Sequence, residues 1–220
     1  MPYIGYFQLM KAVDKYIVYD DVNYIKGGWI NRNNILIGGE KKLFTISLNS
    51  PSPNKLINEI DIKDDFRKLM RTLEMNYAKA PYYKETIGLM ESIINYPDKQ
   101  LARFIANSFK EILMYLNINT ELIFSSEIDK EYALKGQEKV IHICQRMNAT
   151  EYYNAIGGRD LYSVADFKKM GIGLSFLETG SLEYQQHGTD FVPNLSMIDV
   201  LMFNSKIQIN NLLDKYKLIN

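Results

Sequence analysis

The sequence predicts an α/β protein with a layered, mostly parallel sheet of the Rossmann-like kind and a helical insertion around residues 64–116. Three observations lead to this class. In the second half of the chain, short β-branched and aromatic runs alternate with amphipathic helical segments. The middle of the chain has helical periodicity only. Polar clusters follow several predicted strands, which is where parallel sheets bind ligands.

In the first half, residues 6–16 carry apolar side chains at helical spacing, and residues 17–19 form an apolar run typical of a buried strand. Two further strands, at 35–37 and 43–48, flank Gly38-Gly39-Glu40, which predicts a hairpin. Residues 64–116 then form three helices, because prolines interrupt their apolar periodicity twice.

The second half alternates strands with helices. The predicted strands lie at 121–124, 150–153 and 173–177, and the predicted helices at 137–147, 164–167, 195–203 and 207–213. No repeat and no long linker divides the chain, so we expect a single domain over residues 1–220 with a helical subdomain at about 64–116.

Composition excludes several classes of protein. The chain has 220 residues with 26 basic and 26 acidic side chains, so no global charge recruits nucleic acid or a membrane. A site for a polyanion would need a local patch that the net charge does not reveal. No apolar run approaches the ~18 residues of a membrane span. With a single cysteine, the chain has no disulfide framework, and we expect a cytoplasmic protein.

Asp20 and Asp21 follow a predicted strand and are the candidate catalytic residues. Successive strand residues face opposite ways, so we expect only one of them to enter a site. A carboxylate there could accept a proton from an attacking amine or hydroxyl. The structural alternative is that one aspartate caps the next segment while the other pairs with Lys26 or Arg32.

Trp29, Asn31 and Arg32 are candidate ligand-binding residues. The guanidinium of arginine suits two-point recognition of phosphate, carboxylate or a developing oxyanion, and asparagine adds a further donor. The indole of tryptophan could stack on a sugar or a base. As structural alternatives, Arg32 would be a surface residue and Trp29 a core residue.

Two further polar clusters follow predicted strands. Ser125 and Ser126 are either ligand donors or a helix cap. Gly157 and Gly158, followed by Arg159, could let backbone amides approach a phosphate, although paired glycines also form ordinary turns.

Cys144 and His142 are not candidates for catalysis. Two residues apart on a helix, they lie about 200° apart around its axis and do not face each other. Cys144 belongs to an apolar stripe, where a thiol is inert and has a raised pKa. With only two histidines in the chain, we expect neither a metal site nor a cofactor.

Several segments, in order along nearly the whole chain, are similar to one family. They are residues 2–9 (PYIGYFQL), 17–22 (IVYDDV), 28–33 (GWINRN), 54–57 (NKLI), 125–126 (SS), 141–144 (IHIC), 149–152 (ATEY), 157–158 (GG) and 193–199 (PNLSMID). Together they resemble the WbqC-like protein family, found among bacterial genes for O-antigen and other surface polysaccharides. Family members usually carry a further strand and a Gln-Pro turn before PYIGYF, so we expect that first strand to be missing here.

The resemblance implies a transferase that modifies a nucleotide-linked amino sugar by acyl or aminoacyl transfer, for example of glycine. Its expected partners are that nucleotide-linked sugar and the acyl or aminoacyl donor, with self-association left open. One alternative is a non-catalytic module that binds a nucleotide sugar or a carrier. Another is nucleotidylyltransferase-like activity, because Tyr3-Ile4-Gly5-Tyr6 loosely resembles a His-x-Gly-His turn; tyrosines in place of both histidines count against it.

Overall fold

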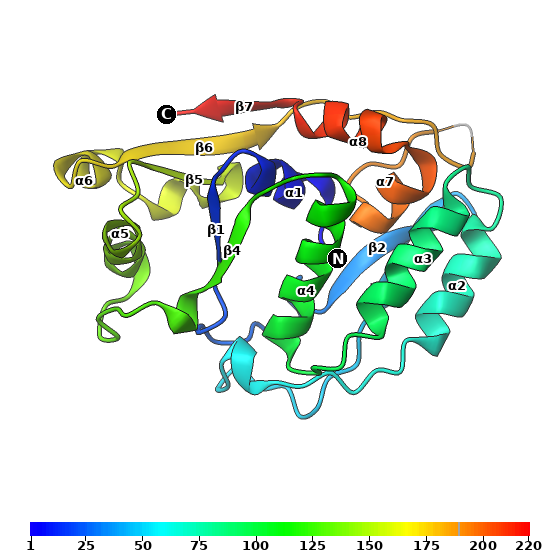
Figure 1. Cartoon of the computed structure of the whole chain (residues 1–220), viewed down its shortest axis with the longest axis horizontal. Helices are drawn as coiled ribbons and strands as arrows, with labels where there is room; N and C mark the ends of the chain where they lie inside the picture. The colour runs from blue at the N-terminus through cyan, green and yellow to red at the C-terminus, as the bar shows by residue number, and fades with distance from the viewer. Residues whose placement is uncertain (189) are drawn as a thin grey trace.

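The computed structural model describes residues 1–188 and 190–220, and its helices and strands confirm the mixed α/β class (Figure 1). The strands lie in three small sheets. β1 (Lys15–Val18) pairs in parallel with β4 (Glu121–Phe124), and β2 (Arg32–Ile37) pairs antiparallel with β3 (Glu40–Thr45). The third sheet contains β5 (Glu151–Ala155), β6 (Gly173–Thr179) and β7 (Tyr216–Ile219).

The strand pairings give three separate sheets, whereas the sequence predicted a single layered sheet. Parallel pairs are present, β1 with β4 and β5 with β6, but no hydrogen-bonded ladder joins these two pairs among the described residues. β7, which the sequence pattern did not predict, adds an antiparallel edge to β6.

The first helix is shorter than predicted. α1 covers Ile4–Lys11, whereas the apolar spacing predicted a helix over 6–16. Tyr16 instead lies on β1, opposite Leu122 of β4, and its ring packs edge-on against Phe109 at 6.4 Å. Strand pairing and this contact therefore override the helical spacing of residues 12–16.

The hairpin and the helical middle are confirmed. Gly38 and Gly39 both have positive φ, as a tight hairpin turn requires. The three helices of the middle stretch are α2 (Arg67–Tyr77), α3 (Tyr83–Ile94) and α4 (Leu101–Tyr115). Their apolar faces share the main core with α1, α7 (Met197–Phe203) and α8 (Lys206–Leu213).

A second, smaller core lies under α5 (Gly136–Arg146), α6 (Val164–Lys169), β5 and β6. Phe167 is its fully buried centre, stacked on Tyr152 with ring centroids 5.4 Å apart. Three short 3₁₀ helices complete the chain: η1 (Ile57–Glu59), η2 (Ser125–Glu127) and η3 (Ile156–Leu161).

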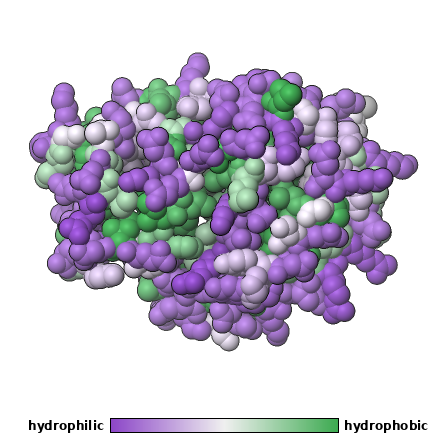
Figure 2. Space-filling view, in the orientation of Figure 1, coloured by the Kyte–Doolittle hydropathy of each residue, from purple (hydrophilic) through white to green (hydrophobic). Residues whose placement is uncertain are grey.

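Hydrophilic residues cover most of the face seen in Figure 2, and apolar residues gather toward its middle. None of the helices in the described part of the chain combines the length and the apolar character needed to cross a bilayer.

Candidate functional site

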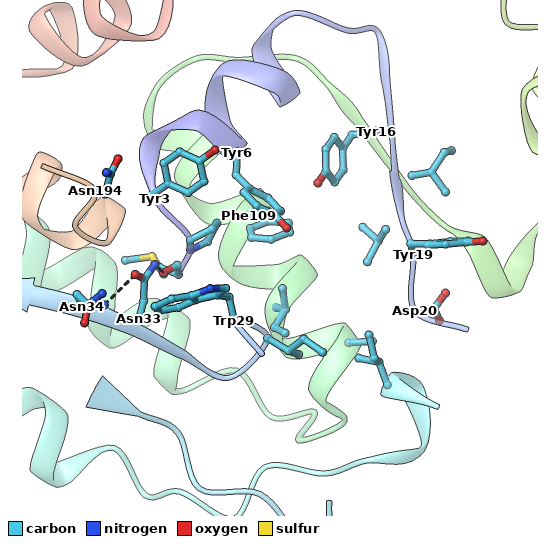
Figure 3. Close-up of a pocket in the computed structure, with 18 of the residues that line it drawn as sticks. Tyr3, Tyr6, Tyr16, Tyr19, Asp20, Trp29, Asn33, Asn34, Phe109 and Asn194 are labelled. Carbon is cyan, nitrogen blue, oxygen red and sulfur yellow. Dashed lines mark hydrogen bonds between the residues drawn. The ribbon is translucent and has the colours of Figure 1, made fainter. Parts of the chain in front are cut away.

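A pocket of about 600 Å³ opens between α1, the end of β1, α4 and the segment that leads into β2 (Figure 3). Six aromatic rings contribute to its wall, namely those of Tyr3, Tyr6, Tyr16, Tyr19, Trp29 and Phe109. Asp20 lies at one end, and Asn33, Asn34 and Asn194 lie at the other. The pocket is therefore apolar in the middle and polar at both ends.

The three asparagines differ in their hydrogen bonding within the described part of the chain. Both polar atoms of the Asn33 side chain are engaged, since its Nδ2 donates to the Met1 carbonyl (2.8 Å) and its Oδ1 accepts from Asn34 N (2.8 Å). The side-chain amides of Asn34 and Asn194 have no hydrogen-bond partner within the described ranges. Each of these amides can donate to and accept from a ligand.

Backbone hydrogen bonds fix this end of the pocket. Ser196 N donates to Asn34 O and Met197 N donates to Pro2 O, both at 2.8 Å. They tie three segments far apart in the chain to one another. Asn194 has φ 58°, a left-handed conformation that asparagine tolerates better than most residues.

A buried carboxylate supports the segment that leads to Asn194. Asp199, fully buried on α7, accepts hydrogen bonds from the hydroxyls of Tyr77 and Tyr184 and from Nε2 of Gln186, each at 2.8 Å. Burial raises the pKa of Asp199 above its ordinary value of 3.8, although these donors partly oppose the rise.

This raised pKa predicts a pH dependence of stability. The folded state holds the Asp199 proton more tightly than the unfolded state, so the contribution is complete below pH 3.8 and is lost as the pH rises through the folded value. Asp199→Asn cannot titrate. We therefore expect the free energy of unfolding of the wild type, minus that of Asp199→Asn, to fall as the pH rises above 3.8. Urea unfolding over a pH series measures this difference, and a difference that rises with pH would contradict the assignment.

Asp20 is held at the carboxyl end of β1. It is 3% exposed and lines the pocket. Its Oδ1 accepts from Ser126 N (2.9 Å), and its Oδ2 accepts from Ser126 Oγ (2.6 Å) and Asn58 Nδ2 (3.1 Å). Asp20 and Ser126, both predicted site residues, are thus hydrogen-bonded to each other, and Oδ1 of Asp20 can accept one more hydrogen bond.

Asp21 points into an ion cluster. Its Oδ2 lies 2.9 Å from the Nζ of Lys130, whose side chain is completely buried, and 3.3 Å from the Nζ of Lys139. Burial alone would raise the pKa of Asp21, but the hydrogen bond from Lys130, together with the charge of Lys139, lowers it below its usual range. Lys130 also donates to the carbonyl of Ser125. The structural alternative, in which one aspartate pairs with Lys26 or Arg32, named the wrong partners, because Asp21 pairs with Lys130 and Lys139.

Trp29 lines the pocket, and Arg32, which does not line it, lies over the Trp29 ring. The guanidinium carbon of Arg32 is 5.5 Å from the Trp29 ring centroid, and its Nε donates to Gly28 O (2.9 Å). Trp29 lines the pocket and is 66% exposed, so it is not a core residue. Asn31 does not line the pocket; it accepts from Tyr24 OH (3.0 Å) and donates to Ile46 O (2.7 Å).

The twin glycines lie on another element. Gly157, Gly158 and Arg159 belong to η3, which follows β5 and packs beside the smaller core, and none of them lines the pocket. Burial, with smaller contributions from Asp21 and Tyr162, raises the pKa of Tyr19, which lines the pocket, to about 12.

The environment of Cys144 agrees with its exclusion as a nucleophile. Burial raises the pKa of the Cys144 thiol to about 11, and Nε2 of His142 accepts from Glu131 N (3.2 Å). No group of three or more potential metal ligands occurs within residues 1–188 and 190–220.

Sequence reasoning missed part of this site. Tyr6, Tyr16, Asn34 and Asn194 come from four segments and carry no shared motif that would mark them as neighbours. Lys130 gave no signal either, because a single lysine in a loop is normally solvated.

Comparison with known proteins gives one family match and one similar protein. The sequence matches the WbqC-like protein family over residues 1–211. It is also 30% identical over 211 residues, 93% of this chain and 89% of the relative, to a protein of Mycobacterium tuberculosis named "Uncharacterized protein Rv1507c". No solved structure matches the chain.

Proposed function

The chain belongs to the WbqC-like protein family, and we propose that its pocket binds a nucleotide-linked amino sugar and transfers an acyl or aminoacyl group to it in surface-polysaccharide assembly. The observation that carries the proposal is the pocket itself, with aromatic walls and polar ends. Its volume of about 600 Å³ lies within the range of small-molecule sites.

The walls suit a sugar ring. Tyr6 and Phe109 lie on one side of the pocket and Trp29 on the other, so a ring between them would bury its C–H faces against aromatic carbon (Figure 3). Asn34 and Asn194, at the end of the pocket away from Asp20, would bind its hydroxyl oxygens. Arg32, stacked on Trp29, would meet a phosphate at the mouth.

Asp20 fits the proton acceptor better than Asp21, because it is the carboxylate that lines the pocket. In the proposed step, the amine nitrogen of the sugar attacks the carbonyl carbon of the donor and a C–N bond forms. The bond from that carbon to the donor's leaving group breaks. The amine proton passes to Oδ1 of Asp20, and the leaving group departs with the bonding electron pair.

A second candidate, from another class, is a non-catalytic module that binds the same ligand. One observation favours it: Asp20 already accepts three hydrogen bonds and Asp21 already meets two lysines. Mass spectrometry separates the two candidates. The protein is incubated with nucleotide-linked amino sugars and activated acyl or aminoacyl donors, and transfer adds the mass of the acyl group. No product from a protein that binds the sugar would favour the module, whereas a product that forms equally well with Asp20→Asn would remove Asp20 as the proton acceptor.

Binding itself gives a sharper prediction. Asn34→Ala removes one uncharged hydrogen-bonding group, worth about 1 kcal/mol, so we expect about fivefold weaker binding of the nucleotide-linked sugar by calorimetry. Asn211→Ala, on the exposed side of α8, is the matched control and should bind as the wild type does. Equal affinities for the two variants would remove Asn34 from the site.

A further inference from the structure

A patch of exposed apolar side chains borders the pocket mouth. Ile25 and Trp29 are each 66% exposed, and Leu43 of β3 is 53% exposed. Three large apolar residues this exposed in one region cost free energy in water, and such patches usually mark a surface that another phase or partner covers.

These residues lie on one side of the molecule. Gly28 N donates to Ile25 O (3.0 Å), which places Ile25 and Trp29 on the same turn. Trp29 and Lys41 both line the pocket. Leu43 lies two residues from Lys41 on β3, so it faces the same side of the hairpin.

The same segment is strongly basic. Residues 22–48 contain Lys26, Arg32, Lys41 and Lys42 against Glu40 alone, a net charge of +3 on a chain whose total charge is zero. In the next segment, 49–60, Lys55 and Glu59 cancel. This is the local patch that the overall charge balance does not reveal.

We propose that this patch, formed by Ile25, Lys26, Trp29, Lys41 and Leu43, docks on an anionic phospholipid surface and turns the pocket mouth toward the headgroups. Tryptophan at the interface, aliphatic side chains pointing outward and a ring of lysine and arginine are the chemistry that such a surface binds. Single-stranded nucleic acid fits less well, because it needs several stacking rings, and Trp29 is the only tryptophan and the only ring in the patch.

The proposal is independent of the transfer reaction, since docking needs no sugar. The earlier expectation of no membrane partner rested on two features, the lack of a membrane-spanning run and the zero net charge. Neither feature excludes binding of a local basic patch to a membrane surface.

The single tryptophan provides the readout, because all indole fluorescence comes from Trp29 in the patch. The full chain is mixed with vesicles of phosphatidylcholine alone, or of phosphatidylcholine and phosphatidylglycerol in equal parts. We expect a blue shift and co-sedimentation only with phosphatidylglycerol, and release at about 1 M salt, where the Debye length is ~3 Å. Brominated lipid should quench the emission.

Variants away from the pocket test the patch. Lys26→Glu changes its charge by two units and should weaken vesicle binding about thirtyfold, while Ile25→Ser should weaken it with the charge unchanged. Lys79→Glu, an exposed control between α2 and α3, should lose far less. Several outcomes would overturn the proposal: equal binding to neutral vesicles, an equal loss with Lys79→Glu, the same blue shift with free glycerol phosphate, or tighter binding to a single-stranded polynucleotide.

Discussion

Asp21→Asn is expected to lower the free energy of unfolding by about 3–5 kcal/mol, because it leaves a buried ammonium without its counter-ion. The Lys130 side chain is completely buried, and Asp21 is the carboxylate within reach of it, at 2.9 Å. An asparagine oxygen could accept one hydrogen bond but would not neutralise the charge. Urea unfolding followed by circular dichroism at neutral pH measures the loss.

The matched control is another aspartate–cation pair, in solvent. Asp129 pairs with Arg146, and its side chain is 90% exposed, so Asp129→Asn should cost no more than about 1 kcal/mol. A double variant, Asp21→Asn with Lys130→Met, should recover part of the loss, because it removes the stranded charge as well. If Asp21→Asn costs no more than Asp129→Asn, the ion cluster does not hold the end of β1.

This result bears on how the two acids divide their roles. Strand alternation predicted that one aspartate would face a site while the other paired, and Asp20 lines the pocket while Asp21 meets two lysines. The pairing partners could not be predicted. Lys139 is 118 positions away along the chain, whereas the nearby cations that the sequence offered, Lys26 and Arg32, do not reach Asp21.

Elements with a strong local signal were predictable. The hairpin turn needs glycine at positive φ. In the three central helices, apolar residues recur at helical spacing, and a strand with the same sequence would not place them on one face. The end of α1 was not predictable, because residues 12–16 keep helical spacing while Tyr16 gains a strand partner in β4 from more than a hundred residues away.

The same distinction applies to the pocket: residues marked by their local sequence were predictable, and residues brought in by long-range contacts were not. Asp20 and Trp29 stood out because a strand end and a lone tryptophan are visible in any short window. Asn34 and Asn194 did not, since only the backbone bonds that join residues 1–3, β2 and the start of α7 bring them to one end of the pocket.

Asp199→Ala should be the other large loss of stability, about 3–5 kcal/mol, because it removes at once the acceptor of three hydrogen bonds at a fully buried position. The hydroxyls of Tyr77 and Tyr184 and the amide of Gln186 all donate to this carboxylate at 2.8 Å. Tyr77 in turn accepts from Leu36 N (2.7 Å), so β2, α2 and α7 share one network. Denaturant unfolding reports the loss directly.

Asp199→Ala should also weaken ligand binding in the pocket, even in molecules that stay folded. Gln186 also binds the backbone of Val192 through both of its side-chain polar atoms, two residues before Asn194, so losing its carboxylate partner loosens the support of that asparagine. We therefore expect weaker sugar binding by Asp199→Ala at a temperature where circular dichroism shows it fully folded. Asp214→Ala removes a carboxylate just after α8 that is 64% exposed and pairs with Lys11, so it should change stability by less than about 1 kcal/mol and leave binding intact. Unchanged binding by folded Asp199→Ala would show that the network stabilises the fold without positioning the pocket.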